Sequence, residues 1–160
     1  MRIAKPSRAQ SLLALAVVSL GAVGAALVTQ HLFDMQPCPW CVLQRLIFLA
    51  IALVALVGVF WRTQGGRLVA AVAVTLLAAC GIASALWQHF VAAASQSCNL
   101  TLADRIVNGS GLDGLAPEIF APRASCADAA VSLFGVPYEF WSLALFVLLG
   151  SAAVRSTFGA

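Results

Sequence analysis

Four long apolar stretches alternate with shorter polar segments along the chain. They cover residues 11–30, 41–61, 68–87 and 138–154. A helix needs about 20 largely apolar residues to cross a bilayer, and the bilayer core offers no water to satisfy backbone groups, so stretches of this length should be helices. The pattern predicts an all-α fold, an antiparallel four-helix membrane bundle that forms one domain over residues 1–160 and contains no strands.

Two polar loops, residues 31–40 and 89–137, connect these helices at one end of the predicted bundle. In the longer loop, residues 112–120 mix apolar and acidic side chains, which predicts a short amphipathic helix lying on the membrane surface. The segment 108–111 reads Asn-Gly-Ser-Gly and indicates a flexible, hydrated part of the loop.

Composition agrees with a membrane domain. The chain is 62% hydrophobic and 9% charged, whereas soluble domains are about 45–50% apolar and about 25% charged. The first stretch follows Arg2, Lys5 and Arg8 and could be read as a signal peptide, but it is longer than the usual apolar region of about 7–15 residues. We therefore expect a retained helix.

Basic residues collect on one side of the predicted membrane. Cytoplasmic loops are enriched in Lys and Arg, and one side holds six such residues without any acidic one: Arg2, Lys5, Arg8, Arg62, Arg67 and Arg155. Both termini should therefore be cytoplasmic and both polar loops should lie outside. The net charge of +3 is explained by this topology and requires no nucleic-acid partner.

Five cysteines are present, and four of them lie in or beside the outer loops. Cys80 falls within the third helix and is expected to be a packing residue, with a redox role as the lesser alternative. The other four face a compartment where disulfides persist, so disulfides are favoured over a zinc site.

Cys38 and Cys41 are separated by two residues at the start of the second helix, the spacing that redox-active dithiols use. Pro39 suits a first helical turn, and the positive end of the helix favours a thiolate at Cys41. Arg45 follows Cys41 by one turn on the same helix face. Its guanidinium either extends to the membrane surface or stabilises the thiolate and binds the oxygen of a flat, membrane-soluble electron acceptor.

Cys98 and Cys126 form the other pair. A structural disulfide closing a loop of that length would contribute roughly 3–4 kcal/mol. We favour thiol-disulfide exchange instead, because a hydrated, glycine-containing loop gives an incoming thiolate access to one sulfur.

The chain resembles the disulfide bond formation protein B (DsbB) family over nearly its whole length. The resemblance rests on the segment 37–45 (PCPWCVLQR), which matches the family pattern P-C-x-x-C-x-x-x-R, on the second cysteine pair, and on Phe134-Gly135 followed by Trp141-Ser142. Gln44 stands where some members of the family carry an acidic residue.

This resemblance implies a role for each candidate residue. Cys98 would form the mixed disulfide with a partner oxidase, and Cys126 would be its companion. Cys38 and Cys41 would pass electrons inward, with Cys41 facing a quinone. Arg45 matches the family's quinone-site arginine, and His89 matches a histidine near that site.

The expected activity is that of a quinone-dependent protein disulfide oxidoreductase in the bacterial inner membrane, which reoxidises a periplasmic DsbA-like dithiol oxidase. The acceptor is ubiquinone or menaquinone. Because a quinone in the bilayer takes the electrons, no bound metal, flavin or nucleotide is expected, and no glycine-rich phosphate-binding loop is visible. Two alternatives remain at this point. One is a four-helix scaffold whose disulfides are only structural, and the other is an exchanger that serves a dedicated partner.

Overall fold

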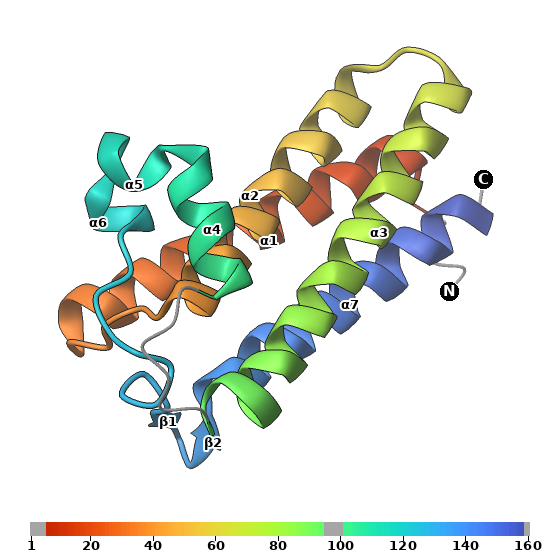
Figure 1. Ribbon diagram of the computed structural model, residues 1–160. Coiled ribbons are helices and arrows are strands. Elements are labelled where there is room, and N and C mark those ends of the chain that lie inside the picture. The colour runs from red at the N-terminus through yellow and green to blue at the C-terminus, as the bar shows by residue number, and fades with distance from the viewer. Residues whose placement is uncertain (1–5, 95–100, 159–160) are drawn as a thin grey trace.

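Four long helices form the body of the molecule. The computed structural model describes residues 6–94 and 101–158, and the long helices are α1 (Arg8–Leu32), α2 (Pro39–Phe60), α3 (Gln64–Trp87) and α7 (Tyr138–Phe158). All four, with α3 counted to Ala92, are long and apolar enough to cross a membrane. Each packs against its neighbours in an antiparallel bundle (Figure 1). The predicted all-α membrane bundle is confirmed.

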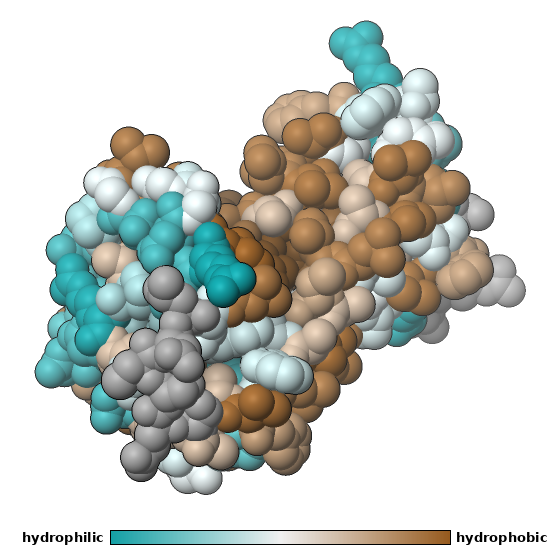
Figure 2. All heavy atoms as spheres, viewed as in Figure 1, coloured by the Kyte–Doolittle hydropathy of each residue, from teal (hydrophilic) through white to brown (hydrophobic). Residues whose placement is uncertain are grey.

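The bundle is close-packed inside and apolar outside. At the seam of α3 and α7, Gly81 has no side chain, so the ring of Phe146 lies against its backbone and stacks on Phe48 of α2 with ring centroids 4.0 Å apart. Apolar side chains also cover the outer surface of the helices (Figure 2). Small residues at helix contacts and apolar residues on the outside are typical of bundles in lipid.

The start of each of the first three helices is capped by a side chain. Ser7, Cys38 and Thr63 accept hydrogen bonds from backbone N–H groups of α1, α2 and α3, respectively. Since these N–H groups have no partner within the helix, such caps stabilise the helix starts. Cys38 is therefore both a candidate redox residue and the cap of α2.

The third helix continues beyond the predicted end at residue 87. A five-residue π-helix, η1 (Gln88–Ala92), follows α3 directly. Short π-helical turns of this kind occur frequently at functional sites. Here the turn carries Gln88 and His89 at the loop end of the bundle.

The long loop is more ordered than its composition predicts. It contains α4 (Leu102–Ser110), α5 (Leu112–Leu115) and α6 (Pro117–Phe120). The segment expected to be flexible forms the end of α4, because Thr101 and Asp104 make a capping box at its start and Gly111 ends it with φ 67°. The single helix predicted at residues 112–120 is instead two separate turns, α5 and α6, because Pro117 starts a new helix.

A two-stranded hairpin precedes α7, so the expectation of no strands is wrong. Strand β1 (Ser132–Leu133) pairs with β2 (Val136–Pro137) in antiparallel register. Phe134 and Gly135 form the two-residue turn with φ of 53° and 78°, which is the backbone that tight hairpins require. A pair this short has no alternating pattern long enough to be recognised in the sequence.

The two ends of the bundle differ. At one end Arg8 Nε donates to the carbonyl of Ser156 at 3.0 Å, which holds the start of α1 beside the end of α7. At the other end α4 and α6 pack on α2 through Val42, Val107 and Phe120. The loop helices therefore cluster with the α1–α2 loop at the end opposite both termini (Figure 1), and polar side chains gather over them (Figure 2).

Candidate active site

Cys38 and Cys41 lie together at the first turn of α2. The backbone N–H of Cys41 donates to Cys38 Sγ at 3.2 Å, and the two sulfur atoms are 2.6 Å apart. Pro39 occupies the first helical turn, where its fixed φ suits the helix and its missing N–H costs nothing. This local geometry lets the two thiols form a disulfide with little backbone movement.

Cys126 joins this pair from the long loop. Its sulfur shares a hydrogen bond with the Cys38 thiol and accepts one from the backbone N–H of Trp40. The backbone N–H groups of Arg123 and Ala124 both donate to the carbonyl of Pro37, at 2.9 and 3.2 Å, which holds this segment against the start of α2. Three sulfur atoms therefore meet at one helix end.

These contacts make the loop thiols unequal. The hydrogen bond from Cys38 lowers the pKa of Cys126. Hydrogen bonding to Cys126 and Cys41, together with burial, raises the pKa of Cys38. Cys126 is therefore more readily ionised than Cys38. The predicted companion of Cys126, Cys98, lies outside the described residues.

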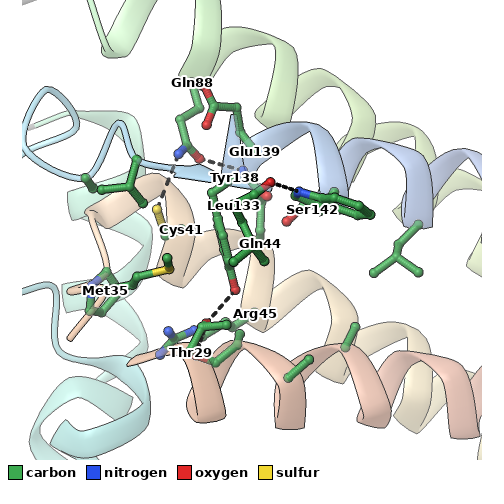
Figure 3. A pocket seen from close by; sticks show the side chains of 18 of the residues that line it. Thr29, Met35, Cys41, Gln44, Arg45, Gln88, Leu133, Tyr138, Glu139 and Ser142 are labelled. Carbon is green, nitrogen blue, oxygen red and sulfur yellow. Dashed lines mark hydrogen bonds between the residues drawn. The ribbon is translucent and has the colours of Figure 1, made fainter. Parts of the chain in front are cut away.

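A pocket of about 230 Å³ opens beside Cys41 (Figure 3). Its walls come from α1, the α1–α2 loop, α2, η1, the hairpin region and α7. Most of the exposed wall area is apolar, although half of the lining residues carry a polar atom: Thr29, Gln36, Cys41, Gln44, Arg45, Gln88, Tyr138, Glu139, Trp141 and Ser142.

Arg45 is held inside the bundle by hydrogen bonds. Its side chain is 6% exposed, and Nη1 donates to Gln30 Oε1 at 2.7 Å and to the carbonyl of Ile119 at 2.9 Å. In the described part of the chain Nε and Nη2 have no such partner. The guanidinium thus fixes α6 to α1 and α2 while keeping N–H donors for a molecule in the pocket. It does not extend to the surface.

Two buried glutamines, Gln44 of α2 and Gln88 of η1, form a chain of hydrogen bonds that ends at the sulfur of Cys41. Gln44 Nε2 donates to Gln88 Oε1 at 2.7 Å, and Gln88 Nε2 donates to Cys41 Sγ at 3.3 Å. A donor aimed at the sulfur favours its thiolate form. Sequence reasoning missed Gln88, although a polar amide in an apolar helix is a signal of function.

His89 does not line the pocket, in contrast to the other residues expected at the quinone site. Its Nδ1 is 2.6 Å from Glu139 Oε1, and Glu139 does line the pocket and is 4% exposed. His89 is thus linked to the pocket only through Glu139. Glu139 was also missed as a site residue, because its partner His89 lies 50 residues away in the chain.

The remaining candidates lie apart from the reactive sulfurs. Cys80 is exposed on α3 and is not part of the pocket wall. Within residues 6–94 and 101–158, no group of three or more His, Cys, Asp or Glu side chains is placed to hold a metal ion.

The contacts arrange the three sulfurs in a row that suits disulfide exchange. Exchange requires a thiolate to reach a sulfur along a clear path. Cys126 contacts Cys38, Cys38 contacts Cys41, and Cys41 alone of these three lines the pocket.

Comparisons with known proteins agree with this chemistry. The family model described as disulfide bond formation protein DsbB matches residues 8–155. The chain is 35% identical over 138 residues to disulfide bond formation protein B of Pseudomonas syringae pathovar tomato, covering 86% of this chain and 82% of the relative. It is 31% identical over 149 residues to the protein of the same name from Herminiimonas arsenicoxydans, covering 92% and 93%, respectively.

The match extends over almost the whole chain and includes every helix of the bundle. This chain has four helices that can cross a membrane, clustered cysteines and relatives that are named disulfide bond formation proteins. These observations together identify a membrane disulfide oxidoreductase. The chain belongs to the disulfide bond formation protein B (DsbB) family.

Proposed function

We propose that this protein oxidises the dithiol of a periplasmic DsbA-like partner and passes the two electrons to a membrane quinone, ubiquinone or menaquinone, in the pocket beside Cys41. The observation that carries the proposal is that Cys41 and Arg45 line the same largely apolar pocket. A nucleophilic sulfur and a guanidinium donor on neighbouring turns suit a flat acceptor with carbonyl oxygens.

The size and position of the pocket support a quinone. Its volume of about 230 Å³ is below the roughly 300–1,000 Å³ of pockets for drug-sized ligands, so it suits a single ring better than a flavin or nucleotide. On the α1 side the wall includes Ala22, Ala25 and Ala26, and Leu145 of α7 also lines the pocket. These apolar positions lead from Cys41 toward the membrane core, where an isoprenoid tail would lie.

The electron relay consists of balanced exchange steps. The partner dithiol reduces the Cys98–Cys126 disulfide. The Cys126 thiolate then attacks Cys38 of the Cys38–Cys41 disulfide and releases Cys41 as a thiolate. Cys98 attacks Cys126 next, which restores the loop disulfide and leaves Cys38 as a thiol. Finally, the Cys38 and Cys41 pair gives two electrons to the quinone and becomes a disulfide again while the quinone becomes a quinol.

The positions of the sulfurs support this order. Cys126 reaches Cys38, so its attack releases Cys41 at the pocket, where Gln88 donates to the sulfur. The terminal acceptor must have a high potential, because DsbA-type oxidases are strong oxidants with potentials near about −120 mV, and the bacterial periplasm is known to be kept oxidising through DsbA, DsbB and quinone.

Orientation is part of the proposal. The basic residues Arg8, Arg62 and Arg155 lie at the end of the bundle that carries both termini, and such residues favour the cytoplasmic side. The sulfur cluster then faces the periplasm across the inner membrane.

The test is quinone reduction by purified protein with a reduced DsbA-like partner and a short-chain ubiquinone or menaquinone. Cys41→Ser should lower the rate by at least about 10³-fold, because the sulfur that reduces the quinone is lost. Cys80→Ser is the matched control and should retain the wild-type rate. Full activity of Cys41→Ser would refute the proposal. A purely structural scaffold would also keep its cysteines oxidised when quinone is depleted, whereas relay cysteines would accumulate as thiols.

A further inference from the structure

Reduction of a quinone requires two protons as well as two electrons. In the relay proposed above, on which this inference rests, Cys41 is released as a thiolate and carries no proton. Cys38 remains a thiol and can supply one. The second proton must come from another group that reaches the quinone.

Few residues in the pocket wall can supply that proton. The titratable side chains there are Cys41, Arg45, Tyr138 and Glu139. The guanidinium of an arginine does not release its proton in proteins, and the Tyr138 hydroxyl is already hydrogen-bonded to Thr29 at 2.9 Å. Glu139 supplies the carboxyl group in the pocket wall and is therefore the remaining candidate for the proton donor.

The surroundings of Glu139 suit a proton carrier. Its side chain is 4% exposed, and Oε1 lies 2.6 Å from His89 Nδ1. Oε2 is buried and has no hydrogen-bond partner among the described residues. An unpaired buried carboxylate oxygen is costly, whereas a protonated Oε2 needs only an acceptor, which a quinone carbonyl provides. His89 is 31% exposed and can exchange protons with water.

The two sides of the pocket match the two carbonyl oxygens of a quinone. Glu139 and Arg45 both line the pocket, and Figure 3 shows Glu139 in the upper part of the view and Arg45 in the lower part. Quinone carbonyls lie on opposite edges of the ring, so one can accept from Arg45 while the other faces Glu139.

We infer that Glu139 is a catalytic acid that protonates the quinone, and that His89 is a positioning residue that returns a proton to it from water. The step is balanced. The Cys38 thiol, the Cys41 thiolate, the Glu139 carboxylic acid and the quinone give the Cys38–Cys41 disulfide, the quinol and the Glu139 carboxylate. Protonated His89 then transfers its proton to Glu139.

A single-turnover experiment tests this inference. Protein reduced with dithiothreitol and freed of reductant is mixed with a short-chain ubiquinone, and the quinone absorbance is followed. Glu139→Gln should slow the reduction by about 10²-fold, since general acids contribute typically 10²–10⁴-fold, with the quinone concentration for half the maximal single-turnover rate within about twofold of wild type. Thiol exchange with the reduced partner should keep its wild-type rate. Glu118→Gln, which changes the exposed glutamate of α6, is the matched control and should behave as wild type.

Two further variants separate acid catalysis from a structural role. Glu139→Asp keeps an acid and should recover part of the lost rate. His89→Gln should leave the first turnover near the wild-type rate but slow repeated turnover, because only reprotonation of Glu139 is impaired. If His89 had only a structural role, His89→Gln would slow the first turnover and repeated turnover equally, and that result would overturn the inference.

Other outcomes are equally decisive. Reduction of quinone by Glu139→Gln at the wild-type rate would refute the acid role of Glu139 and leave the proposed function intact. The acid role would also be refuted if this variant showed a raised half-saturating quinone concentration with an unchanged maximal rate, or if it lost thiol exchange with the partner. Failure of the wild-type protein itself to reduce quinone would instead refute the proposed function.

Discussion

At the residue scale, the three described loop-end cysteines differ in what surrounds each sulfur. Cys38 is fully buried, and its S–H donates a hydrogen bond to the sulfur of Cys126. Cys41 faces the pocket and accepts a hydrogen bond from Gln88. Cys126 accepts from Cys38 and from the backbone of Trp40. Since the thiolate is the nucleophile, these contacts assign attack to Cys126 and keep a proton on Cys38.

Alkylation of Cys126 in the reduced protein is expected to depend on pH accordingly. A thiol reacts slowly below its pKa and fully above it, so a lowered pKa shifts the alkylation profile of Cys126 to lower pH than the ordinary cysteine value of about 8.5. Cys38→Ala removes the donor that lowers this pKa, and the profile should then move to higher pH. Mass spectrometry of the Cys126 peptide after iodoacetamide pulses measures both profiles. Identical profiles in the two proteins would contradict the assignment.

At the scale of single elements, α1 forms one wall of the pocket with small side chains. Ala22, Ala25, Ala26 and Thr29 fall on one face of the helix, as the helical period requires. A larger side chain there would fill the space that we assign to the ring or tail of the proposed quinone. The other faces of α1 contact the rest of the bundle or point outward, so a substitution can be directed to the pocket alone.

Ala26→Phe should therefore weaken quinone binding without affecting the sulfurs. We expect a rise of about tenfold in the KM for quinone, equivalent to about 1.4 kcal/mol, with unchanged thiol exchange between the partner and the protein. Val28→Phe is the matched control, because Val28 is half exposed on the same helix and does not line the pocket. Steady-state kinetics with a varied quinone concentration measure the effect, and equal KM values for the two variants would argue against a quinone in this pocket.

At the scale of the whole molecule, the bundle brings both loops to one end and both termini to the other. The four helices alternate in direction, so the α2–α3 connection lies with the termini. This arrangement separates the basic end from the end that carries the three described sulfurs. One end can thus face the cytoplasm while disulfide exchange takes place on the other side of the membrane.

Two matched glycine positions test this orientation in intact cells. Gly109 lies on α4 and Gly65 near the start of α3, and an added side-chain carbon meets no atom within 4 Å at either site. In a chain whose own cysteines are replaced by serine, Gly109→Cys should react with a membrane-impermeant maleimide added to intact cells. Gly65→Cys should react only after permeabilisation. The reverse labelling pattern would invert the proposed topology.

The helices, and the chemistry that is local to one of them, can be predicted from the amino-acid sequence alone. Length and apolarity require four bilayer-long helices, and the two-residue spacing with Pro39 places Cys38 and Cys41 in one helical turn. Arg45 follows on the same face because the helical repeat places it there. These features depend on residues within about one or two turns of each other, so no knowledge of the packing is needed to predict them.

Which distant groups meet depends on how the helices pack, and this could not be predicted from the sequence. Contacts between Cys126 and Cys38, between Gln88 and Cys41, and between Glu139 and His89 each join segments far apart in the chain. The order of the long loop likewise depends on α4 and α6 packing against α2. Helical periodicity specifies a face but not its partner. The pocket with its amide and carboxyl groups therefore emerges only when α1, α2, η1 and α7 pack together.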